Sequence, residues 1–124
     1  MPPKVLVCDN EEPLRALVCG ALELGDYEIV EARDGDESVR LARACDPDLI
    51  VLDMMMPGRT GLEVLTELRA EDRFAETPVI MLTARAQAQD RETALAAGVS
   101  RFLAKPFSPL ELASVVEELL EDAA

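Results

Sequence analysis

Five short apolar runs recur along the chain, separated by longer stretches of mixed polarity. Three of them read VLV, LIVL and VIML, with no polar residue inside. Strands that are buried on both faces of a parallel sheet have this continuous apolar pattern, because neither of their sides meets water. We therefore predict strands at residues 5–8, 28–32, 49–52, 79–82 and 101–104.

The stretches between the runs have the periodicity of helices. Apolar residues follow the spacing of one buried helix face at Leu14, Leu17, Val18, Ala21 and Leu22, and again at Leu112, Val115, Val116, Leu119 and Leu120. The second of these helices also has a start signal, with Ser108 as N-cap, Pro109 at the first position and Glu111 three residues after the cap. We therefore predict helices between the strands and at the end of the chain.

Strands that alternate with helices predict an α/β fold, with a parallel sheet covered by helices on both faces. The predicted helix at residues 89–97 differs from the others, because it is rich in alanine and weakly amphipathic. Either it is poorly anchored and shifts at low cost, or its alanines pack closely on their neighbours. There are no repeats, low-complexity tracts or interdomain linkers, so we predict a single domain over residues 1–124.

The charge balance limits the partners of this domain. Twelve basic and 25 acidic residues give a net charge of −13. Such a surface repels the phosphates of nucleic acids and anionic lipid heads, so we expect no direct nucleic acid binding and no membrane association. A cationic partner or a metal ion is compatible, although the excess of glutamate also has a simpler explanation as a solubilising surface. No segment approaches the roughly 20 apolar residues of a membrane helix, and we expect a cytoplasmic protein.

The composition excludes several kinds of site. Histidine is absent, and the three cysteines, Cys8, Cys19 and Cys45, form no CxxC pattern. The usual zinc arrangements and any Ser-His or Cys-His nucleophile pair are therefore ruled out. We interpret the cysteines as small buried hydrophobic residues.

Polar side chains follow four of the predicted strands. Asp9 comes after the first strand, Asp53 after the third, Thr83 after the fourth and Lys105 after the fifth. Because the carboxyl ends of parallel strands open on the same edge of a sheet, we expect these groups to converge. Each residue alone is common as a cap, a turn former or a solvated side chain, but the four together are not.

The chemistry of such a group points to phosphate. Two carboxylates in close contact need a compensating charge, which a hard cation such as Mg²⁺ supplies through oxygen ligands. A metal ion, an ammonium group and a hydroxyl together satisfy the three charged oxygens of a phosphoryl group. Asp53 is best placed as a nucleophile, because only a turn follows it.

The sequence as a whole is similar to the receiver domain of two-component response regulators. The stretches VLVCDNEEPLR, PDLIVLDMMMPGRTGLEVL, PVIMLTA, ALAAGVSRFLAKPF and PLEL resemble that family, over about residues 4–120. The resemblance implies a flavodoxin-like sheet of five parallel strands in the order 2-1-3-4-5, flanked by five helices. It also implies that Asp53 accepts a phosphoryl group from the phosphohistidine of a sensor histidine kinase or phosphotransfer protein. The resemblance further implies Mg²⁺ as the cofactor and a domain that catalyses its own phosphorylation and dephosphorylation.

The resemblance also assigns the metal ligands. Asp9 and Asp53 are expected to bind Mg²⁺ through their carboxylates, and Met55 through its backbone carbonyl. Asn10 stands where the family usually has a second acid, so we expect an uncharged ligand and weaker metal binding there. Gly61, after the Met-Pro-Gly turn, is expected to supply a special backbone angle or a close helix approach.

The remaining assigned residues concern the phosphoryl group and the switch. Thr83 is expected to bond a phosphoryl oxygen, and Lys105 to pair with the phosphoryl group. Phe102 matches the aromatic residue that turns inward as Thr83 moves. The bond between Lys105 and Pro106 is commonly cis in the family, and the proline makes this plausible.

As partners, the resemblance implies a downstream effector domain or protein that reads the face formed by the fourth helix, the fifth strand and the fifth helix. A weak homodimer is also compatible. The alternative is a pseudo-receiver that is never phosphorylated, which only Asn10 supports. An enzyme on the same fold fits less well, because the DNEEPLR loop is acidic for a flavin carrier and Met55 replaces the second aspartate of an aspartate-nucleophile phosphatase.

Overall fold

The computed structural model describes residues 2–84 and 88–123, with the backbone alone for residues 88–90. Within this part of the chain, strands alternate with helices, and a short 3-10 helix, η1 (Asp72–Phe74), precedes the fourth strand. The strands are β1 (Lys4–Cys8), β2 (Glu28–Ala32), β3 (Leu49–Asp53), β4 (Val79–Thr83) and β5 (Arg101–Ala104). The helices are α1 (Glu12–Leu22), α2 (Gly35–Cys45), α3 (Gly61–Arg69), α4 (Ala88–Ala96) and α5 (Pro109–Ala123).

All five predicted strands are observed, and their ends agree with the prediction to within one residue. β3 and β4 each end one residue later than predicted, so Asp53 and Thr83 are the last residues of their strands. Asp53 lies opposite Leu82, and Thr83 lies opposite Ala104, in the parallel ladder. The sheet therefore holds the backbone from which two predicted site residues project.

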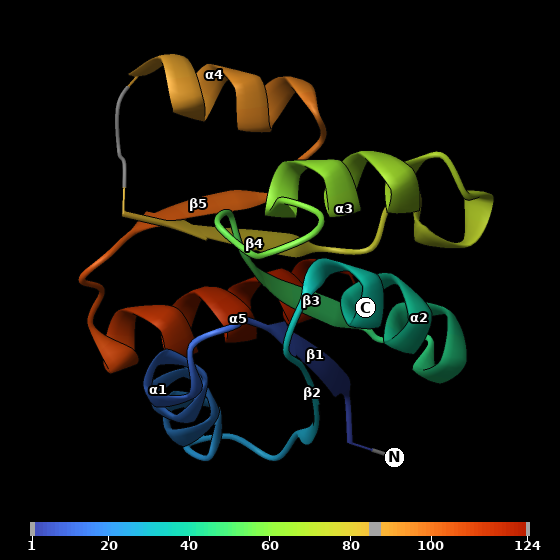
Figure 1. Ribbon diagram of the computed structural model, residues 1–124. Coiled ribbons are helices and arrows are strands. Elements are labelled where there is room, and N and C mark those ends of the chain that lie inside the picture. Colours follow the sequence, from blue (N-terminus) through green and yellow to red (C-terminus); the bar gives the residue numbers. More distant parts are fainter. Residues whose placement is uncertain (1, 85–87, 124) are drawn as a thin grey trace.

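The strands form one parallel sheet in the order β2-β1-β3-β4-β5. Helices α1 and α5 lie on one face of the sheet, and α2, α3 and α4 lie on the other (Figure 1). This is the predicted fold class, a five-stranded α/β sheet in the order 2-1-3-4-5 with five flanking helices. In such a sheet the reversal of strand order beside β1 and β3 opens a crevice at the carboxyl ends of those strands.

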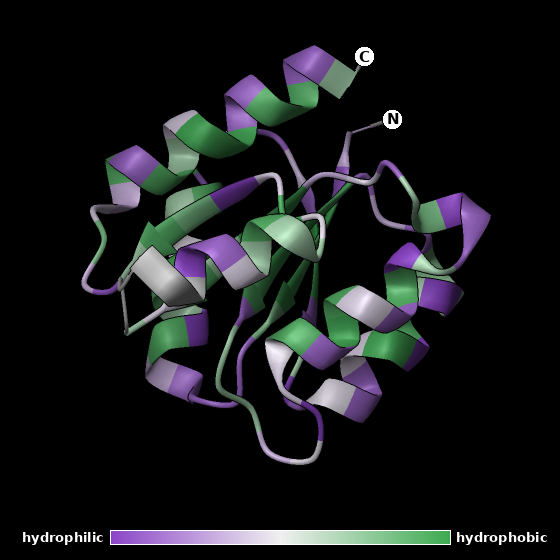
Figure 2. Cartoon of the chain, turned by 90° about the horizontal axis from the view of Figure 1, so that it is seen from above, coloured by the Kyte–Doolittle hydropathy of each residue, from purple (hydrophilic) through white to green (hydrophobic). Residues whose placement is uncertain are grey.

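Each face of the sheet has its own apolar core. One core contains Ile50, Leu52 and Met81 from the strands together with buried residues of α2 and α3, and the other contains Val51 and Ile80 with residues of α1 and α5. Successive residues of β3 therefore point into opposite cores, which explains why the run is apolar without interruption. Figure 2 shows the strands apolar at the centre, with the polar stripes of the helices turned outward.

The predicted helix faces agree with the structure except at one position. Val18, Ala21 and Leu22 of α1 are buried, but Leu17 is 41% exposed, so its placement in the core was wrong. An apolar stripe on a short surface helix is wider than the area its neighbours cover, and Leu17 lies on the margin of the stripe. In α5, the core residues are Leu112, Val115 and Val116, while Leu119 and Leu120 pack against the core from its edge. At its start, the backbone N–H of Glu111 donates to Ser108 Oγ at 3.4 Å, as the capping prediction requires.

The observed α4 is close to the predicted helix at residues 89–97. Ala94 is the only buried side chain among those described in α4, and Leu95 is 55% exposed. Close packing of alanine thus applies to Ala94, whereas a shift of the helix stays a prediction. Part of the RAQAQ segment before it, residues 85–87, lies outside the described residues.

The end of α4 is fixed by a glycine turn. Gly98 has a positive φ of 100°, its N–H donates to Leu95 O at 3.1 Å, and the N–H of Val99 donates to Ala94 O at 3.1 Å. This pair of bonds is a Schellman motif. Arg69, the last residue of α3, donates through Nε and Nη2 to Gly98 O at 3.1 and 2.7 Å. The turn between α4 and β5 is therefore tied to α3.

The three cysteines are free thiols. Cys8 is buried in β1, and burial raises its pKa to about 12. Cys19 and Cys45 are half-buried, so their placement in the core was only partly right. Burial also raises the pKa of Cys19, to about 11. Both values keep these thiols protonated at neutral pH, which makes them poor nucleophiles.

The helices are short. α5, with 15 residues, alternates apolar positions with Glu117, Glu118 and Glu121 along its exposed side. In the described part of the chain, no helix has the length and apolar character that a membrane span needs.

The turn after β3 brings α3 close to the strand. The N–H of Gly61 donates to Met54 O at 2.8 Å, and a Cβ at Gly61 would lie 2.3 Å from Asp53 O. Of the two alternatives for Gly61, the close approach is therefore the observed one. The positive φ in this turn, 79°, belongs to Gly58 instead. α3 then begins with a capping box formed by Thr60 and Glu63.

Gly61→Ala should destabilise the protein, because the added methyl group meets backbone rather than a flexible side chain. We expect the free energy of unfolding to fall by about 1–3 kcal/mol. Urea titration followed by circular dichroism measures it. The matched control is Gly20→Ala in α1, where a Cβ meets nothing within 4 Å, and there we expect a gain of roughly 0.5–1 kcal/mol. An equal loss in both variants would contradict this explanation.

Candidate functional site

Side chains from three strand ends and from the segment after β5 meet at the carboxyl edge of the sheet. Asp9, Asp53 and Thr83 are each no more than 2% exposed. Among the described residues only one other polar side chain, that of Ser38, is buried to this degree. The predicted convergence is therefore observed, and it concentrates buried polar groups at one place in an otherwise apolar interior.

Lys105 joins the two acids. Its Nζ donates to Asp53 Oδ1 at 2.9 Å and lies 3.8 Å from Asp9 Oδ2. The backbone N–H of Lys105 donates to Thr83 O at 2.7 Å, and the peptide bond to Pro106 is cis, as predicted. The side chain of Lys105 is 16% exposed, so one ammonium group provides the positive charge for both buried carboxylates.

Asp9 is incompletely satisfied. Its Oδ1 accepts a hydrogen bond from the N–H of Glu11 at 2.9 Å, but its buried Oδ2 has no hydrogen-bond partner among the described residues. Burial raises the pKa of Asp9, and the charge of Asp53 raises it further, while the Glu11 N–H and Lys105 lower it. A buried carboxylate oxygen without a hydrogen bond favours a proton or a cation beside it.

The predicted metal ligands are oxygen donors of the kind that Mg²⁺ prefers, and only two of them carry a charge. Asp9 and Asp53 supply buried carboxylates, and Asn10 is exposed beside them. The side chain of Met55 is 67% exposed, and its thioether is too soft a ligand for Mg²⁺, so Met55 can offer a hard cation only its backbone carbonyl. No cluster of three or more His, Cys, Asp or Glu side chains that could hold a metal occurs among the residues described. Mg²⁺ needs only one or two carboxylates, so the assignment of these residues as its ligands stays a prediction.

Phe102 lies on β5, away from the acids. Its ring is partly buried and packs against the core between the sheet and helices α2, α3 and α4. The guanidinium carbon of Arg91, on α4, lies 5.6 Å from the centre of the ring. The aromatic side chain is thus placed between α4 and the sheet. Its role as a switch, together with Thr83, stays a prediction.

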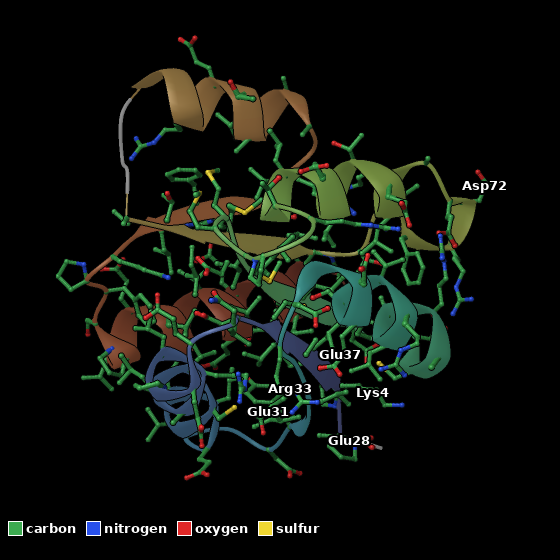
Figure 3. The ribbon with its side chains drawn as sticks, in the orientation of Figure 1. Lys4, Glu28, Glu31, Arg33, Glu37 and Asp72 are labelled. Carbon is green, nitrogen blue, oxygen red and sulfur yellow. The ribbon has the colours of Figure 1, made fainter. Side chains whose placement is uncertain are left out.

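One contact at the site was not predicted from the sequence. Arg15, in the first turns of α1, donates through Nη1 to the backbone carbonyl of Asp9 at 2.9 Å and through Nε to Glu31 Oε1 at 3.0 Å. Glu31, which Figure 3 labels, lies on β2, so the two bonds of Arg15 join α1 to both the end of β1 and β2. The sequence offers a weak signal for this contact, since Arg15 is three and seven residues before Val18 and Leu22, which are buried on the same side of the helix.

A parallel α/β fold with two acids and a lysine at its carboxyl edge is the arrangement expected of a signalling receiver domain, and comparisons with known proteins agree. A family model described as "Response regulator receiver domain" matches residues 5–117. The chain therefore belongs to the response regulator receiver domain family. It is a signalling domain.

Individual relatives support the same assignment. The Phosphate regulon transcriptional regulatory protein PhoB of Escherichia coli is 38% identical over 97% of this chain and 52% of its own length. The Transcriptional regulatory protein ResD of Bacillus subtilis is 40% identical over 98% of the chain and 49% of its own length. The chain thus spans about half the length of these relatives.

Solved structures of other receiver domains have the same fold as this chain. The receiver domain of the Francisella response regulator 1452 has a TM-score of 0.92 at 33% identity, covering 98% of this chain and 99% of that chain. The Vibrio cholerae chemotaxis protein CheY4 has a TM-score of 0.90 at 30% identity, covering 96% and 99%.

The raised pKa of Asp9 predicts a pH-dependent effect of Asp9→Asn. The native state keeps this proton to higher pH than the unfolded chain does. The stabilisation from the protonated acid is therefore complete below the ordinary pKa of 3.8 and is lost as the pH rises through the raised pKa. Asparagine has no proton to lose, so without divalent cations the variant should unfold at a higher temperature than the parent near neutral pH. This gain should shrink on acidification.

Thermal unfolding followed by circular dichroism over a pH series measures the effect. Asp26→Asn removes the same charge at an exposed position in the loop after α1 and controls for the change in net charge. A gain for Asp9→Asn that stays constant from neutral to acidic pH would argue against burial as its cause.

Proposed function

We propose that this domain is a phosphorylation-controlled switch that accepts a phosphoryl group on Asp53 in a Mg²⁺-dependent reaction. The observation that carries this proposal is the contact of Lys105 Nζ with Asp53 Oδ1 at 2.9 Å, at the edge of the sheet where the side chains of Asp9 and Thr83 are also buried. The ammonium group lies where a phosphoryl group on Asp53 would need a positive charge. The donor is the phosphohistidine of a sensor histidine kinase or of a phosphotransfer protein.

The reaction transfers phosphorus from nitrogen to oxygen. A carboxylate oxygen of Asp53 forms a bond to phosphorus as the phosphorus–nitrogen bond of the phosphohistidine breaks, and the electron pair of that bond stays on the imidazole. Lys105 then pairs with a phosphoryl oxygen instead of the bare carboxylate, and the hydroxyl of Thr83 donates to another. Positioning and charge are the main contributions of this chain, which makes it a catalyst of its own phosphorylation and dephosphorylation.

The cation is held by Asp9, Asn10, Asp53 and the backbone carbonyl of Met55. Support comes from Asp9 Oδ2, which is buried and lacks a hydrogen-bond partner in the described chain. When bound, Mg²⁺ supplies positive charge that offsets the two carboxylates and the oxygens of the phosphoryl group.

The output is a change on the face formed by α4, β5 and α5. Thr83 ends β4, and Phe102 packs between the sheet and α4, so a movement of Thr83 toward the phosphoryl group would open space for the ring. Phosphorylation then shifts an existing equilibrium between two conformations. An effector domain or protein downstream reads the result, and a weak homodimer is compatible. With a net charge of −13, the domain itself does not contact nucleic acid.

The alternative, a pseudo-receiver that is never phosphorylated, is favoured only by Asn10. It keeps the fold and the partner surface but needs neither Mg²⁺ nor a reactive Asp53. The first experiment below separates the two functions.

Incubation with acetyl phosphate and Mg²⁺ should add one phosphoryl group to the protein, detected by intact mass spectrometry. Asp53→Asn should abolish the adduct, because an amide is no nucleophile for phosphorus at neutral pH. Omission of Mg²⁺ should reduce the yield strongly. A parent protein without any adduct, or an adduct that persists in Asp53→Asn, would favour the pseudo-receiver or a different acceptor.

Asn10→Asp should tighten Mg²⁺ binding, because it restores a third carboxylate beside the cation. One unit charge about 4 Å from a divalent ion is worth about 2 kcal/mol even in water-like surroundings, so we expect about a tenfold or greater gain in affinity. Isothermal titration calorimetry measures it. Ala44→Glu adds the same charge at an exposed position in the last turn of α2, at the opposite edge of the sheet, and should change the affinity little. Unchanged or weaker binding by Asn10→Asp would refute the assignment of Asn10 as a ligand.

A further inference from the structure

Asp9 is held by contacts on its backbone as well as its side chain. Its N–H donates to Ala32 O at 3.1 Å and continues the ladder between β1 and β2 by one bond. Its Oδ1 accepts the N–H of Glu11. The carbonyl of Asp9 lies beyond the last ladder pair, where β1 leaves β2, and it accepts from Arg15 Nη1 at 2.9 Å. A guanidinium on α1 thus supplies the bond that the neighbouring strand no longer provides.

Arg15 is well fixed for this contact. Its side chain is only 11% exposed, although α1 is a surface helix. Nε donates to Glu31 Oε1 at 3.0 Å while Nη1 donates to Asp9, so two edges of one planar group are occupied at once. Because the guanidinium group is planar and rigid, it fixes the positions of its two acceptors relative to each other, which a single flexible ammonium group does not.

The peptide bond between Asp9 and Asn10 is planar, so the direction of the Asp9 carbonyl also sets the direction of the Asn10 N–H and the start of the next residue. Both residues are in the ligand set proposed above. In other metal sites, the groups that orient the ligands affect affinity strongly although they never touch the ion. Arg15 occupies this position relative to Asp9 and Asn10.

We propose that Arg15 is a positioning residue for the divalent cation. Through the carbonyl of Asp9, it holds the turn between β1 and α1 so that the side chains of Asp9 and Asn10 face the ion together. The effect is geometric rather than electrostatic, because the positive charge of Arg15 is paired with Glu31. The inference rests on the proposed function, since it concerns the same Mg²⁺ site.

The test compares Mg²⁺ affinity with stability in four variants. Arg15→Met keeps an unbranched apolar stem and removes both donors. Arg15→Lys keeps the charge but not the fork, and it covers the case in which the methionine variant does not fold. The matched control is Arg40→Met in α2, where the side chain is 68% exposed and contacts only Glu37 on its own helix among the described residues. Isothermal titration calorimetry gives the dissociation constant for Mg²⁺, and thermal unfolding in EDTA gives the stability without metal.

We expect Arg15→Met to bind Mg²⁺ at least about tenfold more weakly than the parent, and Arg15→Lys roughly threefold more weakly. Arg40→Met should bind like the parent. A merely structural role would lower the unfolding temperature in EDTA and leave the affinity of the folded protein unchanged. Glu31→Gln keeps an oxygen acceptor for Nε and should therefore lose less affinity than Arg15→Met.

The outcomes separate the two proposals. Tight binding by the parent and equally tight binding by both Arg15 variants overturns the role of Arg15 and leaves the metal site intact. A parent protein that binds no Mg²⁺ overturns the metal site and the role of Arg15 with it. Weakened binding in the Arg15 variants, with the control unchanged, supports both.

Discussion

The burial of two like charges at one sheet edge is the constraint on which the rest of this structure depends. Asp9 and Asp53 lie in an interior that is otherwise almost wholly apolar, and carboxylates are costly to remove from water without a counter-charge. The parallel sheet makes the arrangement possible, because its two cores hold the strands rigidly while their ends open to one side. Lys105 lowers the energetic cost of burying the two carboxylates, since its ammonium group contacts Asp53 and approaches Asp9. The protein can therefore fold with both acids buried, and the two carboxylates together still carry one negative charge more than Lys105 compensates.

Most of the scaffold was predictable from the sequence, and the reason is topological. Continuous apolar runs have few interpretations other than strands covered on both faces, and alternation with helices requires a parallel arrangement. Once the strands are parallel, the residues that follow them share an edge, whatever the details of packing. The parallel topology alone therefore predicts that four side chains converge at one edge of the sheet, those of Asp9, Asp53, Thr83 and Lys105. The roles of these residues are predictions from the family resemblance, whereas the family itself is shown by the matched family model and the relatives.

The features that could not be predicted depend on contacts between elements far apart in the sequence. The bond from Arg15 to the Asp9 carbonyl exists because α1, β1 and β2 meet at one corner, which no local pattern encodes. The exposure of Leu17 depends on how much of α1 its neighbours cover. Likewise, Phe74 is fully buried in a 3-10 helix that is too short to have a recognisable period. Local propensity predicts the helices and strands. How much of a helix its neighbours cover, and which distant group a side chain contacts, depend on how those elements pack together.

The attachment of α4 has a mechanical consequence. Its carboxyl end is closed by the Gly98 turn and tied to α3 by Arg69, whereas Ala94 is the one described side chain of the helix that lies in the core. A helix that is held at its carboxyl end can rotate about that end but cannot shift along its own axis. The helix has nine residues and is about 13 Å long. In the proposed switch, a displacement that enters α4 from the side of Thr83 would therefore become a rotation about the Gly98 turn.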